Sequence, residues 1–194
     1  AEIAELKAIA QQDGVEELKP WDATYYSEKL KQQQFNLSQE ALKPYFPAPK
    51  VVDGLFQIVQ RLYGIQIIER HAPVWQNDVR YFEIEDQGQV VGGFYFDLYA
   101  RNGKRGGAWM SGFRSRVQTA NGLQKPICYM VCNFTPPIGD QPALLTHDEV
   151  ITLFHEFGHG LHHMLTEVDN ISVAGTHGVA WDAVELPSQF MEFW

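Results

Sequence analysis

The segment His155-Glu156-Phe157-Gly158-His159 has the H-E-x-x-H pattern. In a helix, residues four apart project from one face, so two imidazole nitrogens here can close on one Zn²⁺ ion. Glu156 is adjacent in sequence and points to the side of that face. This direction suits a general base acting on a water at the metal better than it suits a ligand. The pattern therefore predicts a zinc site with a catalytic glutamate.

The residues around this motif predict the helix that positions it. Thr146 and Glu149 have the spacing of a capping box, and an apolar period continues to about residue 167. One predicted face is apolar and carries Val150, Leu153, Phe154, Phe157, Leu161 and Met164. The other face is ionisable and carries Asp148, Thr152, His155, His159, His162 and His163. The alternative is a buried polar helix whose histidines are satisfied by hydrogen bonds.

Two glycines inside this predicted helix, Gly158 and Gly160, indicate a close approach. Each disfavours the helix by about 1 kcal/mol relative to alanine. A helix that keeps both is expected to need the space for a neighbouring backbone or for a substrate.

A third zinc ligand must come from outside the motif. Glu167 and Asp169 lie about two turns beyond it and cannot fold back along the helix. The remaining candidates are acids on a predicted last helix, residues 182–194, namely Asp182, Glu185 and Glu192. The first two have capping-box spacing themselves, which favours a capping role for Asp182 and leaves that role open for Glu185 as its partner.

The rest of the chain predicts an α+β fold, with helical segments around a small antiparallel sheet. The pattern divides the chain into a helical block (1–64), a sheet block (65–135) and a block with the zinc-site helices (136–194). Alternating residues predict strands at 65–70, 80–85, 90–98, 107–113 and 126–134. Their connections are short, and short connections favour antiparallel pairing.

Composition excludes several classes of protein. There are 15 Lys and Arg against 24 Asp and Glu, and a net charge of −9 predicts neither nucleic-acid nor anionic-membrane binding. The longest apolar run, residues 127–132, is too short to cross a membrane. Cys128 and Cys132 lie within it and are expected to be buried free thiols in a reducing compartment. With no signal peptide visible, a cytoplasmic location is predicted.

Residues 155–163 and 181–189 together closely resemble the zinc metallopeptidase family of thimet oligopeptidase, neurolysin and oligopeptidase A, with the bacterial oligopeptidase A branch most similar. Residues 94–99, 133–134 and 146–150 extend the resemblance, which covers nearly the whole chain. It implies that His155, His159 and Glu185 bind one Zn²⁺ and that Glu156 is the catalytic base. It also implies short peptides as substrates, hydrolysed in a channel beside a small sheet.

Members of that family are considerably longer than this chain. Their C-terminal helical region supplies oxyanion and substrate donors, and the chain stops at Trp194, just past the implied third ligand. The resemblance therefore implies an incomplete catalytic domain that needs the missing C-terminal helical region for activity. A non-catalytic zinc- or peptide-binding fragment is the alternative, and a purely structural metal helix is a third hypothesis.

Substrate contacts are predicted at two places. Gly107, Ala108 and Trp109 begin a strand of the kind that edges the channel in the resembled family, and a peptide could pair with its backbone. The alternative is an ordinary strand whose glycines mark a bulge. His177 is the nearest further hydrogen-bond donor that the sequence offers, and a plain loop histidine is its alternative role.

Overall fold

The structure, a computed structural model, describes residues 2–35 and 38–194 and divides into two compact units, 1–45 and 46–194. The first unit contains α1 (Glu2–Gln12), η1 (Pro20–Asp22), α2 (Ala23–Phe35), α3 (Gln39–Leu42) and η2 (Lys43–Tyr45). Its small core joins Ile9 and Ala10 to Tyr26. None of the predicted site residues lies in this unit.

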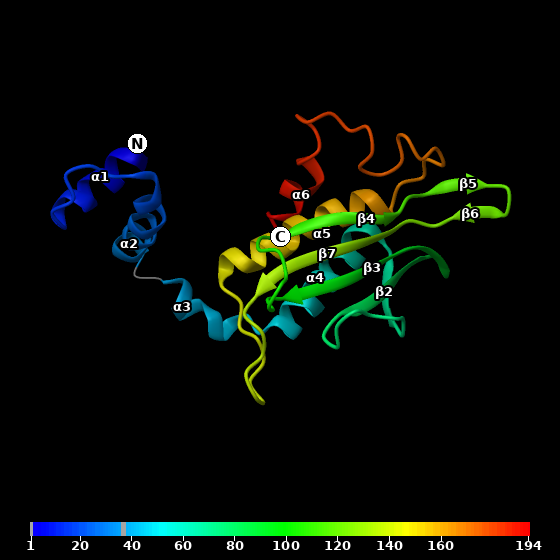
Figure 1. Ribbon diagram of the computed structural model, residues 1–194, viewed down its shortest axis with the longest axis horizontal. Helices are drawn as coiled ribbons and strands as arrows, with labels where there is room; N and C mark the ends of the chain where they lie inside the picture. Colours follow the sequence, from blue (N-terminus) through cyan, green and yellow to red (C-terminus); the bar gives the residue numbers. More distant parts are fainter. Residues whose placement is uncertain (1, 36–37) are drawn as a thin grey trace. The chain divides into compact units, whose positions relative to one another are not determined.

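The second unit is built on a five-stranded sheet of order β1-β2-β3-β7-β4 (Figure 1). The strands are β1 (Gln66–Arg70), β2 (Arg80–Asp86), β3 (Gln89–Tyr99), β4 (Trp109–Arg114) and β7 (Ile127–Phe134). A separate two-stranded ribbon, β5 (Val117–Thr119) and β6 (Gly122–Gln124), lies between β4 and β7 in the chain. The mixture of helices and sheet confirms the predicted class at that level.

The sheet is mixed, so the prediction of purely antiparallel pairing is wrong. β3 and β7 are parallel, with Gly93 opposite Ile127 and Phe96 opposite Met130. Short connections favour antiparallel pairing only between strands that are consecutive in the chain, and β3 and β7 are not consecutive. β7 returns from the β5–β6 ribbon into the space between β3 and β4, so β4 becomes the edge strand.

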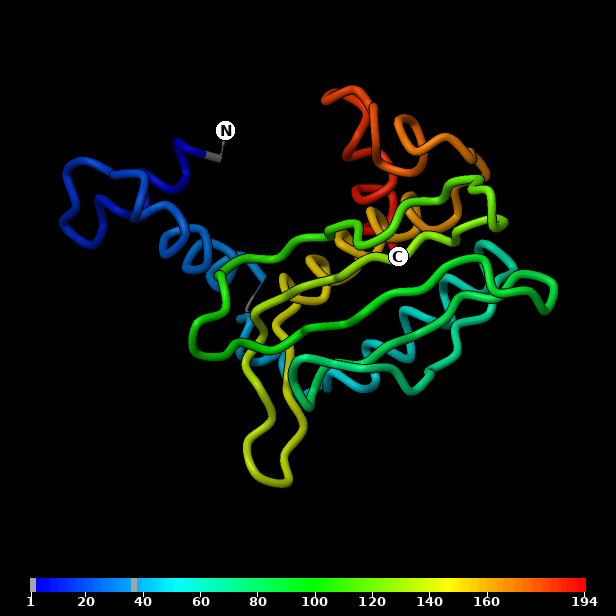
Figure 2. The backbone as a smooth tube through the Cα atoms, turned by 45° about the vertical axis from the view of Figure 1, so that its right-hand side comes forward, coloured from blue at the N-terminus to red at the C-terminus, as the bar shows by residue number. Residues whose placement is uncertain are grey.

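Two helices, α4 (Ala48–Tyr63) and α5 (His147–Met164), cover one face of this sheet (Figure 2). Leu55 and Val59 of α4 are fully buried, and Phe157 of α5 meets Phe94 with ring centroids 5.3 Å apart. Gly64 ends α4 in the left-handed conformation, as its sequence predicts. The predicted apolar face of α5 is buried in this core apart from the half-buried Val150, so the helix rests on a packed support.

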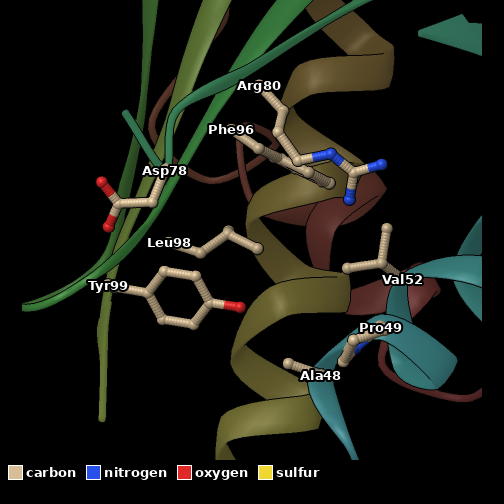
Figure 3. A pocket seen from close by; sticks show the side chains of 8 residues that line it. All are labelled: Ala48, Pro49, Val52, Asp78, Arg80, Phe96, Leu98 and Tyr99. Atoms are coloured by element: carbon tan, nitrogen blue, oxygen red, sulfur yellow. The ribbon is translucent and has the colours of Figure 1, made fainter. Parts of the chain in front are cut away.

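A small cavity lies between the start of α4 and the sheet (Figure 3). Its volume is about 40 Å³, enough for a few water molecules. Asp78 points away from α4, whereas the Tyr99 hydroxyl points toward the cavity. None of the predicted site residues is among the residues that line it. Among the described helices, none is long and apolar enough to cross a membrane.

The last helix is shorter than predicted. α6 runs only from Leu186 to Met191, and residues 181–185 form turns. The predicted capping box at Asp182 and Glu185 is therefore wrong, because the helix begins after both residues. Pro187 lies in the first turn of α6, where its missing N–H costs nothing. Glu185 occupies the N-cap position without capping the helix through its side chain, which leaves its carboxylate for other contacts.

Candidate metal centre

The start of α5 is fixed by the capping box that the sequence predicts. The Glu149 N–H donates to Thr146 Oγ1 at 3.1 Å, and the Thr146 N–H donates to Glu149 Oε2 at 2.8 Å. These bonds satisfy two backbone donors of the first turn. Since the helix starts here and ends at Met164, the whole H-E-x-x-H segment is helical and presents His155 and His159 on adjacent turns.

The glycines of α5 mark close approaches, as predicted. A Cβ at Gly158 would lie 2.5 Å from Pro187 O and 2.5 Å from Ser188 Cα, so α6 crosses the helix at this point. A Cβ at Gly160 would instead meet the flexible Met130 side chain of β7, with Sδ at 2.9 Å. The contact at Gly158 brings the start of α6, and with it Glu185, over the motif.

Three side chains converge at this crossing. Glu185 Oε2 lies 3.2 Å from His155 Nε2 and 3.1 Å from His159 Nε2. Each of the three residues offers one ligand atom, and these three atoms all lie within 4.8 Å of one another. All three residues are half-buried, so the group is open on one side. Two imidazole nitrogens and a carboxylate oxygen in this arrangement are a donor set that suits Zn²⁺.

The charges around this group favour the protonation states that a metal requires. Burial lowers the pKa of His159, so its imidazole is held neutral. Burial alone would raise the pKa of Glu185, but the Ser188 hydrogen bond and the two histidines outweigh this effect and lower that pKa. Ser188 Oγ lies 2.9 Å from Glu185 Oε2 and keeps the carboxylate oriented. Neutral imidazoles and an ionised carboxylate are the forms that bind zinc.

A second acid, Glu192, contacts the opposite nitrogen of one ligand ring. Its Oε1 lies 2.6 Å from His155 Nδ1. A carboxylate there fixes the ring orientation and keeps the proton on Nδ1, which leaves Nε2 free to bind. The sequence placed Glu192 among the possible third ligands, whereas the geometry places it behind a ligand. Its spacing from Glu185, about two helical turns, is the signal that could have indicated this role.

Glu156 lies on the sheet side of the cluster. It is 7% exposed, and burial raises the pKa of its carboxyl against the opposing effects of His155 and of a backbone hydrogen bond from Met110 in β4. A raised pKa brings a carboxylate closer to the range in which it exchanges protons at neutral pH. Glu156 is thus a buried acid that interacts with His155 and with the backbone of the edge strand.

Of the predicted docking residues, Trp109 begins that edge strand, whereas Gly107 and Ala108 lie just before it, so the strand starts later than the sequence predicts. Gly107 has φ of 95° and its carbonyl accepts a hydrogen bond from Asn133 Nδ2 at 2.7 Å, so this carbonyl is already engaged. Ala108 and Trp109 are half-buried, and Trp109 pairs with Val131 of β7 on the inner side of β4. The outer side of β4 is the edge of the described sheet.

Two further histidines have different outcomes: His177 lies in a loop, as the sequence suggests, whereas His163 does not lie on its predicted face. His177 is exposed in the loop before α6, 3.2 Å from the Ala174 carbonyl, and does not join the cluster of His155, His159 and Glu185. His163 is 1% exposed, so its prediction on the open face of α5 is wrong. Two steps of four residues from His155 turn the side chain by about 80°. That rotation carries His163 off the open face and under β4.

Comparison with known proteins identifies the family of this chain. Residues 1–194 match the sequence profile of Peptidase family M3. Oligopeptidase A of Escherichia coli (strain K12) is 57% identical over 197 residues, which cover 100% of this chain and 29% of that protein. A dipeptidyl carboxypeptidase of the same strain is 41% identical over 197 residues, covering 100% of this chain and 28% of that protein.

A more distant relative, saccharolysin of Saccharomyces cerevisiae (strain ATCC 204508 / S288c), is 35% identical over 184 residues, covering 90% of this chain and 26% of that protein. The chain thus spans less than a third of the length of these relatives. The profile match covers every residue, and three bacterial oligopeptidase A sequences are 52–57% identical over the whole chain. This chain belongs to peptidase family M3.

Proposed function

We propose that the chain is the zinc-binding part of a metalloendopeptidase of the gluzincin type, which hydrolyses peptide bonds of short oligopeptides. One observation carries the proposal: His155, His159 and Glu185 each offer a ligand atom to a common point, within 4.8 Å of one another. The peptidase names of the M3 relatives support the reaction class. One Zn²⁺ per chain is the proposed cofactor.

The residues around this point have distinct proposed roles. Bound zinc would supply a Lewis acid that polarises the scissile carbonyl and acidifies water. Glu156 takes the proton of the attacking water and passes it to the leaving amine, and the raised pKa of its buried carboxyl suits both steps. Glu192 holds the ring of His155 through Nδ1, and Ser188 holds the carboxylate of Glu185.

The edge strand β4 is the proposed docking site of the peptide. A substrate that pairs with the free side of Ala108 and Trp109 would run beside Glu156, because the next residue, Met110, already contacts that glutamate through its backbone. Main-chain pairing of this kind reads the extended shape of a peptide more than its sequence. His177 lies apart from the cluster, and a substrate role for it remains only a prediction.

The test is hydrolysis of a quenched oligopeptide by the full-length protein, with and without a chelator. We expect the chelator to abolish turnover and added Zn²⁺ to restore it. Turnover that a chelator leaves unchanged would contradict the proposal. Zinc binding without turnover would instead favour a non-catalytic zinc- or peptide-binding role. A cytoplasmic location remains a prediction, which the two buried free cysteines support.

A further inference from the structure

The imidazole of His163 is buried at the meeting point of three segments. It comes from the last turn of α5 and is 1% exposed. On one side it contacts β4, and on the other it contacts the loop that leads from α5 to Glu185. The roles proposed above for the cluster and for β4 leave this histidine without a function.

On the strand side, His163 meets an irregularity in the pairing of β4 with β7. The register shifts between Gly112 and Arg114, which is a β-bulge. A bulge withdraws backbone groups from the regular ladder. His163 Nε2 lies 2.9 Å from the Arg114 carbonyl and donates to it. The side chain thus supplies the partner for a carbonyl at the point where the strand changes direction.

Two glycines make room for the ring. A Cβ at Gly112 would lie 3.0 Å from His163 Cε1, and a Cβ at Gly175 would lie 3.0 Å from His163 Nδ1. Gly175 also has φ of 61°, which favours glycine independently. The ring is therefore held between the bulge of β4 and the loop that precedes Glu185.

Protonation agrees with this arrangement. The Nδ1 atom of His163 is buried and has no hydrogen-bond partner among the described residues. With Nε2 donating to Arg114, an unprotonated Nδ1 leaves a neutral ring, and burial lowers the pKa of His163 accordingly. The ring is therefore a fixed neutral group, which donates from Nε2 to the Arg114 carbonyl and also has a backbone hydrogen-bond contact at Ile127 in β7.

We propose that His163 is a positioning residue for peptide binding, which holds the C-terminal half of β4 in place through the Arg114 carbonyl. The inference rests on the proposed docking of peptide along β4. The same strand contacts Glu156 through Met110, so a shift of β4 would also disturb the base. His163 is not a member of the cluster of His155, His159 and Glu185.

The test compares two substitutions in the full-length protein. His163→Gln keeps an N–H donor near the position of Nε2, whereas His163→Met fills the space without a donor. Peptide affinity is measured in the zinc-loaded Glu156→Gln background, where binding is read without turnover, and KM and kcat are measured in the active protein. We expect His163→Met to weaken peptide binding and raise KM about tenfold, with His163→Gln restoring most of the loss.

Zinc stoichiometry separates this inference from the proposed function, because both variants are expected to keep one Zn²⁺. Unchanged peptide affinity in a folded His163→Met variant would overturn the inference. Equal losses in the methionine and glutamine variants would also overturn it, since the hydrogen bond would then not matter. If His163→Met fails to fold, His163→Asn replaces it: its shorter amide does not reach Arg114, so we expect the same loss relative to His163→Gln. Equal peptide affinity in these two variants would overturn the inference.

Discussion

Two polar clusters of this molecule differ in how completely their atoms are engaged. Around Asp97, Arg101 donates to both carboxylate oxygens at 2.6 and 2.8 Å, and Trp75 Nε1 donates at 3.0 Å. Lys104 Nζ adds a contact to Asp97 at 2.9 Å and reaches the carbonyls of Tyr99 and Cys132. Asp97 is only 4% exposed, so the cluster is a buried and saturated network.

The cluster of His155, His159 and Glu185 has the opposite character. The cluster is half-buried, and its three ligand atoms face one another, with Ser188 Oγ as a neutral donor to Glu185 Oε2 and no Lys or Arg among the three residues. In the Asp97 cluster a cation from the chain itself, Lys104, already occupies the centre. In the other cluster the three facing ligand atoms are a donor set that suits a metal ion. The Asp97 cluster, whose charge is compensated by side chains of the chain itself, thus stabilises the fold, whereas the cluster of His155, His159 and Glu185 suits a metal ion.

The largest effect is expected from the loss of the proposed base, Glu156, beside the cluster of His155, His159 and Glu185. Glu156→Gln removes the proposed base without removing a ligand, so peptide hydrolysis should fall by about 10²–10⁴-fold while zinc stays bound. The matched control is Glu167→Gln, an exposed acid close after α5, which should leave the rate unchanged. Chelator-sensitive turnover of a quenched peptide measures the effect. A Glu156→Gln enzyme with the parental rate would contradict the proton-transfer role.

A break in the saturated cluster should cost stability instead. Asp97→Ala leaves the ammonium of Lys104 buried without its carboxylate, and removing one partner of such a pair destabilises a protein by about 3–5 kcal/mol. Zinc stoichiometry in the folded fraction should not change. Chemical denaturation measures the free energy of unfolding. A variant that lost zinc but kept its stability would reverse the proposed roles of the two clusters.

The two helix glycines offer a finer comparison. Gly158→Ala would push against the backbone of α6 at Pro187 and Ser188, whereas Gly160→Ala meets only the flexible Met130 side chain. Overpacking of this kind costs about 1–3 kcal/mol. Because Glu185 directly precedes α6, zinc affinity should fall about tenfold or more in Gly158→Ala and little in Gly160→Ala. Isothermal titration with Zn²⁺ distinguishes the two, and equal affinities would show that the crossing does not set the site.

The smallest effect should be a dependence of stability on acid pH. Burial alone would raise the pKa of Asp97, but hydrogen bonds from Arg101, Lys104 and Trp75 outweigh burial and lower that pKa to about 2. Since the unfolded chain then binds the proton more readily, the free energy of unfolding should fall by about 2 kcal/mol as pH drops from about 4 to 2. Asp97→Asn should flatten this part of the profile. A variant with the same slope would assign the effect to other groups.

Residues only a few positions apart predict the start of α5, its buried face and the close approach at Gly158. The capping box of Thr146 and Glu149 and the apolar period fixed the start and the buried face of α5, and Gly158 signalled a close neighbour. These features depend on residues only a few positions apart. The pairing of His155 and His159 follows from the same short-range geometry.

Tertiary packing decided what the sequence could not. β7 inserts between β3 and β4 because of contacts far apart in the chain, so the parallel pair was missed. The short α6 depends on its crossing with α5, which released Glu185 from the predicted capping role. The positions of Glu192 and His163 also follow from that packing, since each contacts a segment about 40 or more residues away.

The central claim is that His155, His159 and Glu185 bind one Zn²⁺. The most direct test measures zinc content and affinity in the parent protein and in His155→Ala, Glu185→Ala and Glu156→Gln variants, each checked for folding by circular dichroism. We expect one Zn²⁺ per chain in the parent and in Glu156→Gln, and loss of tight binding in the two ligand variants. Undiminished tight binding in both His155→Ala and Glu185→Ala would contradict it.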